Sequence, residues 1–256
     1  MKAKNNTFSL TRLFFLGKRQ VLGNLSGFLI AFGAFAGTLL VISLLAGYSD
    51  PGRLSRIAPL FYVALFIGGY VFTSNIFAEL HSPQRSIPFL TLPVSKLERL
   101  LNAWLLTAIL FPVLALLSYA LVVFLAHLIL GVPLTATAFS MVWSKSAFNV
   151  VMIYVITQSI FLFGAIYFRK HNFIRTLLSL FVLQIVISIF LTIIVYLLFG
   201  KTHFSEEVFV QQTNLSPAME QFFTKTLVDI AKFSFNYLLV PFFLMLTWFG
   251  IKERQV

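Results

Sequence analysis

The composition of this 256-residue chain is that of a protein immersed in lipid rather than in water. It is 59% hydrophobic and 11% charged, whereas a soluble domain carries about 25% charged residues. The net charge of +11 would suit a nucleic-acid partner, but cations in a membrane protein gather in its cytoplasmic loops, so we expect membrane lipids and no nucleic acid as partners. With no cysteine, disulfides and thiolate metal sites are excluded.

Residues 7–20 predict a helix that lies in the headgroup plane rather than across the membrane. Apolar residues are interspersed there with Arg12, Lys18 and Arg19, which is typical of an amphipathic interfacial helix. The alternative is that the segment extends the first membrane span. We favour the interfacial helix because two adjacent cations and Asn24 separate it from the apolar run that follows.

Six later runs are long enough to cross the hydrocarbon core, which takes about 20 apolar residues. These runs cover residues 25–48, 57–80, 100–130, 147–168, 176–200 and 233–250. The predicted fold class is therefore an all-α integral membrane protein, a single domain of six transmembrane helices. In the first run Gly33 and Gly37 form a GxxxG pair, whose usual role is close helix packing, either within the chain or against a second copy.

Lysine and arginine are unevenly divided between the two sides of this arrangement. If the N-terminus is inside, most of the 19 cations fall in the inner segments, which are residues 1–24, 81–99, 169–175 and 251–256. Cytoplasmic loops carry such an excess. The distribution therefore predicts that both termini are cytoplasmic.

The inner loop 81–99 has the most specific pattern in the chain. Its three prolines exclude one continuous helix, because each ring removes a backbone donor and disfavours the α conformation in the residue before it. Ser95 and Glu98 have the spacing of a capping box. We therefore expect a structured loop that ends sharply where the third span begins.

The outer segment 201–232 is the longest polar stretch. Ser216 and Pro217 suit the N-cap and first position of a helix, and apolar residues then recur at helical spacing. This pattern predicts an amphipathic helix over residues 217–231 on the outer surface. A re-entrant hairpin that starts the sixth span is the alternative.

Few groups inside the spans have the chemistry of an active site. Paired carboxylates, histidine pairs and a catalytic triad are missing from the sequence, as is a Walker-type phosphate loop. We therefore expect no enzymatic activity, cofactor or metal in this chain. Gln158 and Gln184 lie deep in their spans and are candidate pathway residues, with interhelical hydrogen bonding as the alternative for each.

The stretch from Phe89 to Arg99, Phe-Leu-Thr-Leu-Pro-Val-Ser-Lys-Leu-Glu-Arg, resembles the segment between helices two and three in permease subunits of type-2 ABC exporters. The helix at 7–20 looks like that family's elbow helix. The six spans, the outer element before the last span and the tail from Trp248 to Arg254 are similar to its topology as well.

The resemblance implies a permease subunit in a bacterial inner membrane. Two permease subunits, identical or related, would form the exporter's pathway, and separate ATPase subunits that hold ATP and Mg would dock beneath them. The loop 81–99 would carry the coupling helix. The docking residues expected from the resemblance are Glu79, Arg85, Lys96, Glu98 and Arg99.

Two other classes of function fit parts of the sequence. A non-transporting scaffold or regulator would keep the permease-like fold, and Gln158 and Gln184 would then only pack. An ion-coupled carrier or membrane-embedded enzyme is disfavoured because such proteins place ionisable residues inside the membrane, and these are scarce here.

Overall fold

The computed structural model describes residues 8–23, 25–50, 54, 58–81, 94–134, 144–199, 221 and 225–253. Within these ranges the regular structure is entirely helical. Six helical stretches are long and apolar enough to cross a membrane, which confirms the all-α prediction and indicates a multi-pass membrane protein.

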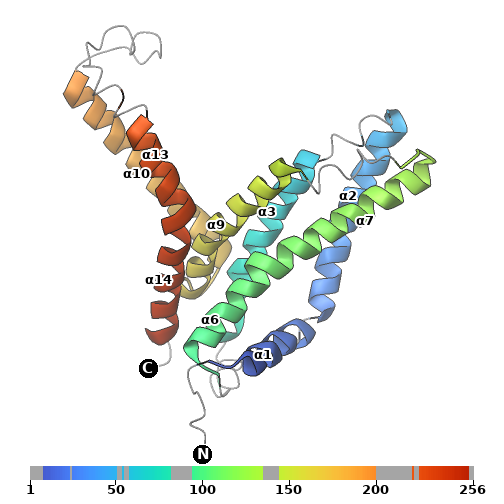
Figure 1. Ribbon diagram of the computed structural model, residues 1–256, viewed down its shortest axis with the longest axis horizontal. Coiled ribbons are helices and arrows are strands. Elements are labelled where there is room, and N and C mark those ends of the chain that lie inside the picture. Colours follow the sequence, from blue (N-terminus) through green and yellow to red (C-terminus); the bar gives the residue numbers. More distant parts are fainter. Residues whose placement is uncertain are drawn as a thin grey trace, which may run out of the picture.

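The first two helices are separate elements. Helix α1 covers Leu10–Gly23 and α2 covers Leu25–Ser49. Figure 1 shows α1 lying across one end of the bundle, whereas α2 runs along it. This change of direction excludes the alternative that the N-terminal segment simply extends the first span.

The remaining helices follow the predicted spans closely. They are α3 (Ala58–Asn75), α4 (Ala78–His81), α6 (Lys96–Leu105), α7 (Phe111–Leu130), α9 (Lys145–Tyr167), α10 (Asn172–Phe199), α13 (Leu227–Phe233) and α14 (Leu239–Glu253). Between α6 and α7 lies the π-helical turn η2 (Leu106–Leu110), and between α13 and α14 lies η4 (Ser234–Leu238).

Both π-helical turns lie just before a proline. Pro112 follows η2, and Pro241 follows η4. Proline has no N–H and its ring clashes with the carbonyl four residues back. The helix widens instead, so that the amide of Phe111 bonds the carbonyl of Leu106 and the amide of Leu239 bonds that of Ser234. The third and sixth spans thus continue through their prolines.

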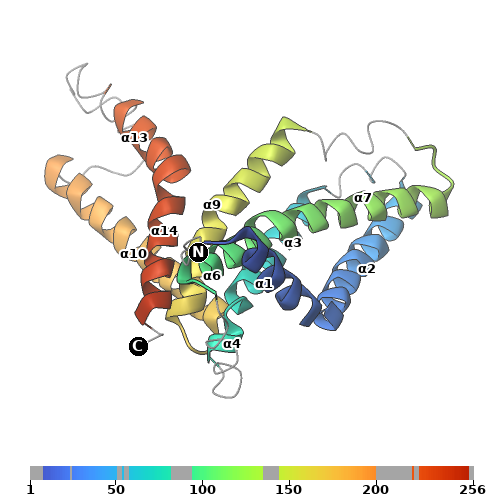
Figure 2. The same cartoon turned by 60° about the horizontal axis from the view of Figure 1, so that its bottom comes forward.

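Among the described residues the helices form two larger hydrophobic clusters, and a small third one surrounds Leu54 and Ala126. One larger cluster lies between α2, α3 and α7 around Phe61, Leu65 and Tyr119. The other joins α6, α9 and α14 to the end of α3 through residues such as Leu162 and Ile251. In contrast, α10 is largely exposed, and only its N-terminal part, where Asn172 and Thr176 are buried, packs beside α9 and α3. Figures 1 and 2 show α10 and α13 diverging from α9 toward their far ends.

One end of the molecule gathers parts of all four segments that the sequence predicts to be inner. Helix α1, the start of α6, the turn between α9 and α10, and the end of α14 all lie there, and Figure 2 shows α4 at the same end. This grouping matches the even number of spans between these segments.

The structure differs from the sequence prediction in the outer segment. Residues 227–231 belong to α13, which continues through η4 into α14, so this part of the expected surface helix is instead the beginning of the sixth membrane-length helix. Most of the outer segment, residues 201–220, lies outside the described residues.

Candidate functional site

Helix α6 begins with the predicted capping box. The Ser95 hydroxyl accepts a hydrogen bond from the Glu98 amide at 3.1 Å, and a Glu98 carboxylate oxygen accepts one from the Ser95 amide at 2.7 Å. The prediction is thus confirmed. Two of the amides left unpaired at a helix start are satisfied here, so the chain that follows the proline-rich loop enters α6 in one fixed geometry.

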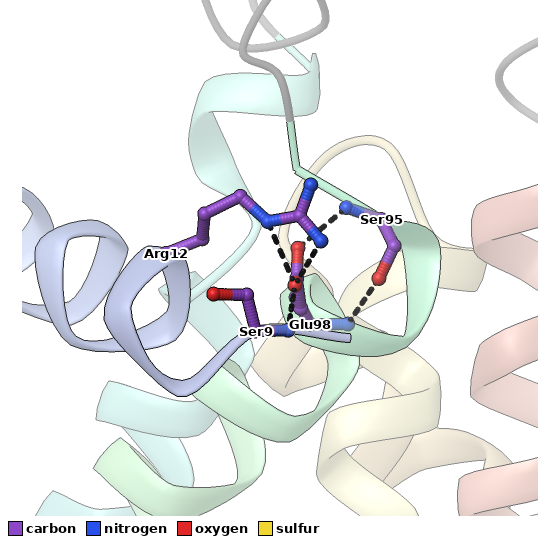
Figure 3. A network of polar contacts seen from close by, with 4 residues as sticks. All are labelled: Ser9, Arg12, Ser95 and Glu98. Atoms are coloured by element: carbon purple, nitrogen blue, oxygen red, sulfur yellow. Dashed lines mark hydrogen bonds and ion pairs between the residues drawn. The ribbon is translucent and has the colours of Figure 1, made fainter. Parts of the chain in front are cut away.

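The Glu98 carboxylate also holds helix α1. Its Oε1 atom accepts a hydrogen bond from the Ser9 amide at 2.6 Å. The same oxygen accepts from Arg12 Nε at 3.1 Å and pairs with Arg12 Nη2 at 2.9 Å. Figure 3 shows Ser9 and Arg12 approaching Glu98 from one side and Ser95 from the other. The carboxylate that caps α6 therefore also holds α1 against α6. We call these contacts of Ser9, Arg12, Ser95 and Glu98 the junction.

This arrangement explains how a carboxylate can be buried at this position. Glu98 has no exposed surface, whereas the Arg12 side chain is 30% exposed. Burying an ion costs several kcal/mol unless a partner charge and hydrogen bonds replace its hydration. Two backbone amides and one guanidinium supply that replacement here, and charge-assisted bonds of this kind are about twice as strong as neutral ones.

A second contact joins α1 to α6 about two turns further along α1. Asn102, buried on α6, donates from Nδ2 to Gln20 Oε1 at 2.7 Å. The backbone of α1 lies close to the Asn102 side chain there, because a Cβ atom at Gly17 would come within 2.8 Å of Asn102 Oδ1. Gln20 in turn donates from Nε2 to the carbonyl of Ile76 at 3.1 Å, where the chain turns between α3 and α4. Helix α1 therefore contacts both sides of the loop.

The residues expected to meet an ATPase fall into two groups. Glu79 on α4 and Lys96 at the start of α6 are partly exposed, but Glu98 and Arg99 are buried. Arg85 lies outside the described residues. The docking role of these residues stays a prediction, and within this chain the Glu98 carboxylate is bonded to Ser9, Arg12 and Ser95.

Gln158 lies on α9 and faces the π-helical turn η2. It is fully buried, and its Nε2 donates to the hydroxyl of Thr107. The neighbouring Tyr154 donates its hydroxyl to the Thr107 carbonyl at 2.9 Å. Residue 112, which would supply the N–H for that carbonyl in a π-helix, is proline, so Tyr154 supplies the missing donor. Gln158 thus acts in this chain as an interhelical contact.

The other candidates have few neighbours. Gln184 lies on α10 and is exposed, so the structure does not bring it together with the buried Gln158. A Cβ atom at Gly33 or Gly37 would meet nothing within 4 Å. The glycine pair therefore makes no close helix contact within the part of the chain that the structure describes, which leaves contact with a second copy as the open alternative.

The sequence alone does not single out the α1 side of these contacts. Its pattern predicts Arg12 only as a cation of an amphipathic helix and indicates no role for Ser9 or Gln20. No signal in one sequence links residue 12 to residue 98, since the contact depends on how α1 folds back. Among the residues that the structure describes, no three His, Asp or Glu side chains come together as a metal site requires.

Comparisons with known proteins add no family. No family model matches the chain, and neither a curated protein nor a solved structure matches it.

Proposed function

We propose that this chain is the permease subunit of an ATP-driven exporter of the type-2 ABC class. It works as a dimer of identical or related permeases in a bacterial inner membrane, with both termini in the cytoplasm. Separate ATPase subunits hold ATP and Mg, and they dock on the loop 81–99. This chain then carries the substrate pathway and hydrolyses no ATP.

One observation carries the proposal, namely the rigid junction at Glu98. An ATPase that drives helices by pushing on a loop needs a stiff connection between them. Here the loop leads directly into a helix that is capped by Ser95 and held to α1 through Arg12. A force applied at Lys96, the first residue of α6 and partly exposed, reaches the third span without passing through a hinge in the described chain.

Two further features support the same assignment. The six apolar helices and the separate α1 agree with the architecture that the sequence resemblance implies. The exposed apolar surface of α10 and the open glycines of α2 are compatible with a second permease subunit. A non-transporting scaffold with the same fold is the alternative hypothesis. Capture of an ATPase distinguishes the permease from the scaffold.

The direct test is co-purification in mild detergent, with every captured protein identified by mass spectrometry. The wild-type chain is compared with an Arg85→Glu/Lys96→Glu variant, which reverses the two loop cations outside the buried junction. We expect a stoichiometric ATPase with the wild type and its loss from the variant, since surface charges guide and align such contacts.

The matched control is Arg169→Glu/Lys170→Glu in the turn between α9 and α10. Both side chains are exposed, and the change removes the same number of cations from the same end of the molecule, so it reproduces any effect on membrane orientation. This control is expected to retain the ATPase. A folded wild-type chain that captures no ATPase contradicts the proposal and favours the scaffold.

A further inference from the structure

The loop 82–93 is flanked by two described elements, α4 before it and α6 after it. Apolar packing joins these flanks, since Leu80 of α4 packs against the cluster that contains Leu100 and Ala103 of α6. Such packing is non-directional, so it sets the position of one flank against the other less strictly than hydrogen bonds do. Directional contacts between the flanks are supplied by α1.

The first contact fixes the α4 side. The second span is interrupted at Ile76 and Phe77, where a turn separates α3 from α4. A turn of this kind leaves backbone carbonyls without helical donors, and Gln20 of α1 donates to the carbonyl of Ile76. The side-chain amide of Gln20 therefore sets where α4 leaves the end of α3.

The second contact fixes the α6 side. Ser9 and Arg12 hold the Glu98 carboxylate, and the Oε1 atom of Gln20 accepts from Asn102. One residue, Gln20, thus bonds both flanks at once, through its Nε2 atom to the α4 side and through its Oε1 atom to the α6 side. Because α1 is a single helix from Leu10 to Gly23, the contacts made by Arg12 and Gln20 keep a fixed separation.

We propose that α1 is a strut that holds the two flanks of the docking loop at one spacing, with Arg12 and Gln20 as its positioning residues. The strut makes α4 and α6 move as one body when the loop is pushed. Its role in coupling rests on the proposed function, but the fixed spacing is a property of this chain alone and can be measured without any ATPase.

The spacing is measured by pulsed electron–electron spin resonance on the full chain in lipid nanodiscs. The natural chain has no cysteine, so Glu79→Cys and Lys96→Cys introduce the only two labels, one on each flank and both at partly exposed positions. We expect a narrow distance distribution in the otherwise unchanged chain. The Arg12→Ala/Gln20→Ala change is expected to broaden it clearly.

The control is Lys18→Ala/Arg19→Ala, which shortens two exposed side chains of the same helix and is expected to leave the distribution narrow. If Arg12→Ala/Gln20→Ala does not yield folded protein, Gln20→Glu is used, because it keeps the acceptor for Asn102 and loses only the donor to Ile76. Broadening with Gln20→Glu supports the strut.

An unchanged distribution in either folded variant overturns the strut, as does equal broadening in the control. The result is independent of ATPase capture. A narrow distribution that broadens as expected, together with a chain that captures no ATPase, would retain the strut and remove the proposed function.

Discussion

At the scale of single residues, the central feature is a carboxylate that is contacted by four donor nitrogens. Glu98 accepts from the Ser9 and Ser95 amides and from two nitrogens of Arg12. An isolated salt bridge between exposed groups contributes about 0–1 kcal/mol. This one differs because two of its donors are backbone amides, which a change of charge at position 12 leaves in place.

Exchanging the charges of Arg12 and Glu98 is therefore expected not to preserve the stability of the protein. In the Arg12→Glu/Glu98→Arg variant the amides of Ser9 and Ser95 face a cation and lose their acceptor. We expect a loss of roughly 2–4 kcal/mol in unfolding free energy, as when buried partners are left unsatisfied. Unfolding in mixed micelles measures this loss, and recovery of wild-type stability by the exchange would show that the junction is a simple ion pair.

Ser95 and Ser9 provide a matched pair of changes. Ser95 uses its hydroxyl as the cap, so Ser95→Ala is expected to cost about 1 kcal/mol. Ser9 contributes its backbone amide, so Ser9→Ala is expected to change stability by less than about 0.5 kcal/mol. The same micelle unfolding measures both. Equal losses for the two changes would contradict the assigned contacts.

At the scale of the elements, proline and its substitute donor explain the shape of the third span. The Thr107 carbonyl lacks a helical donor because residue 112 is proline, and the Tyr154 hydroxyl bonds it instead. This approach needs a small residue on α3, since a Cβ atom at Gly69 would collide with the Tyr154 ring. The Thr107 carbonyl in η2 is thus matched by a tyrosine on α9 and a glycine on α3.

A double-mutant cycle tests this substitution of donors. Tyr154→Phe leaves the carbonyl unsatisfied and is expected to cost about 1–2 kcal/mol. In a Pro112→Ala background the restored backbone N–H can bond the carbonyl, so Tyr154→Phe should cost measurably less. Unfolding of the four proteins in micelles supplies the coupling energy. A loss that is equal in both backgrounds would mean that Tyr154 does not compensate for the proline.

Two glycines distinguish a helix contact within the chain from a helix surface that is open to a partner. A Cβ atom at Gly164 on α9 would collide with Thr176 on α10, so Gly164→Ala is expected to push these helices apart and lower the melting temperature. Gly37→Ala on α2 meets nothing within 4 Å and should leave the melting temperature of the chain unchanged. Thermal unfolding of both variants, followed by circular dichroism, makes the comparison.

The same pair also reports on a second copy. If α2 packs against a second copy of this chain, Gly37→Ala should weaken self-association, while Gly164→Ala affects the fold first. Light scattering in detergent measures the oligomeric state. A Gly37→Ala variant that loses its own helical fold would show that α2 packs inside the chain after all.

At the scale of the whole molecule, hydropathy alone predicts the six long helices because each must cover the membrane with apolar side chains. The start of α6 was equally predictable, since a capping box is recognised from four consecutive residues. The contacts between α1 and α6 could not be predicted. The Arg12–Glu98 and Gln20–Asn102 pairs join positions more than 80 residues apart, and their contact follows from the placement of α1, which no local pattern encodes.

Burial was also beyond the reach of the sequence. Residues 96, 98 and 99 all lie in the polar start of α6, yet Lys96 is partly exposed while Glu98 and Arg99 are buried. The difference arises because α1 and α14 pack against α6 and cover part of its surface. For the same reason Gln158 and Gln184, which the sequence places at similar depth, differ completely: the first is buried and the second faces outward.

The most direct test of the proposed permease function is site-specific photo-crosslinking from the start of α6 in living cells. A photoreactive amino acid replaces Lys96 in the full chain, and Gln184, exposed on α10, serves as the control position. We expect Lys96 to crosslink to a protein whose sequence contains a Walker phosphate loop and Gln184 not to do so. A crosslinked partner that lacks such a loop, or no partner at Lys96 in a correctly inserted chain, would contradict the proposed function.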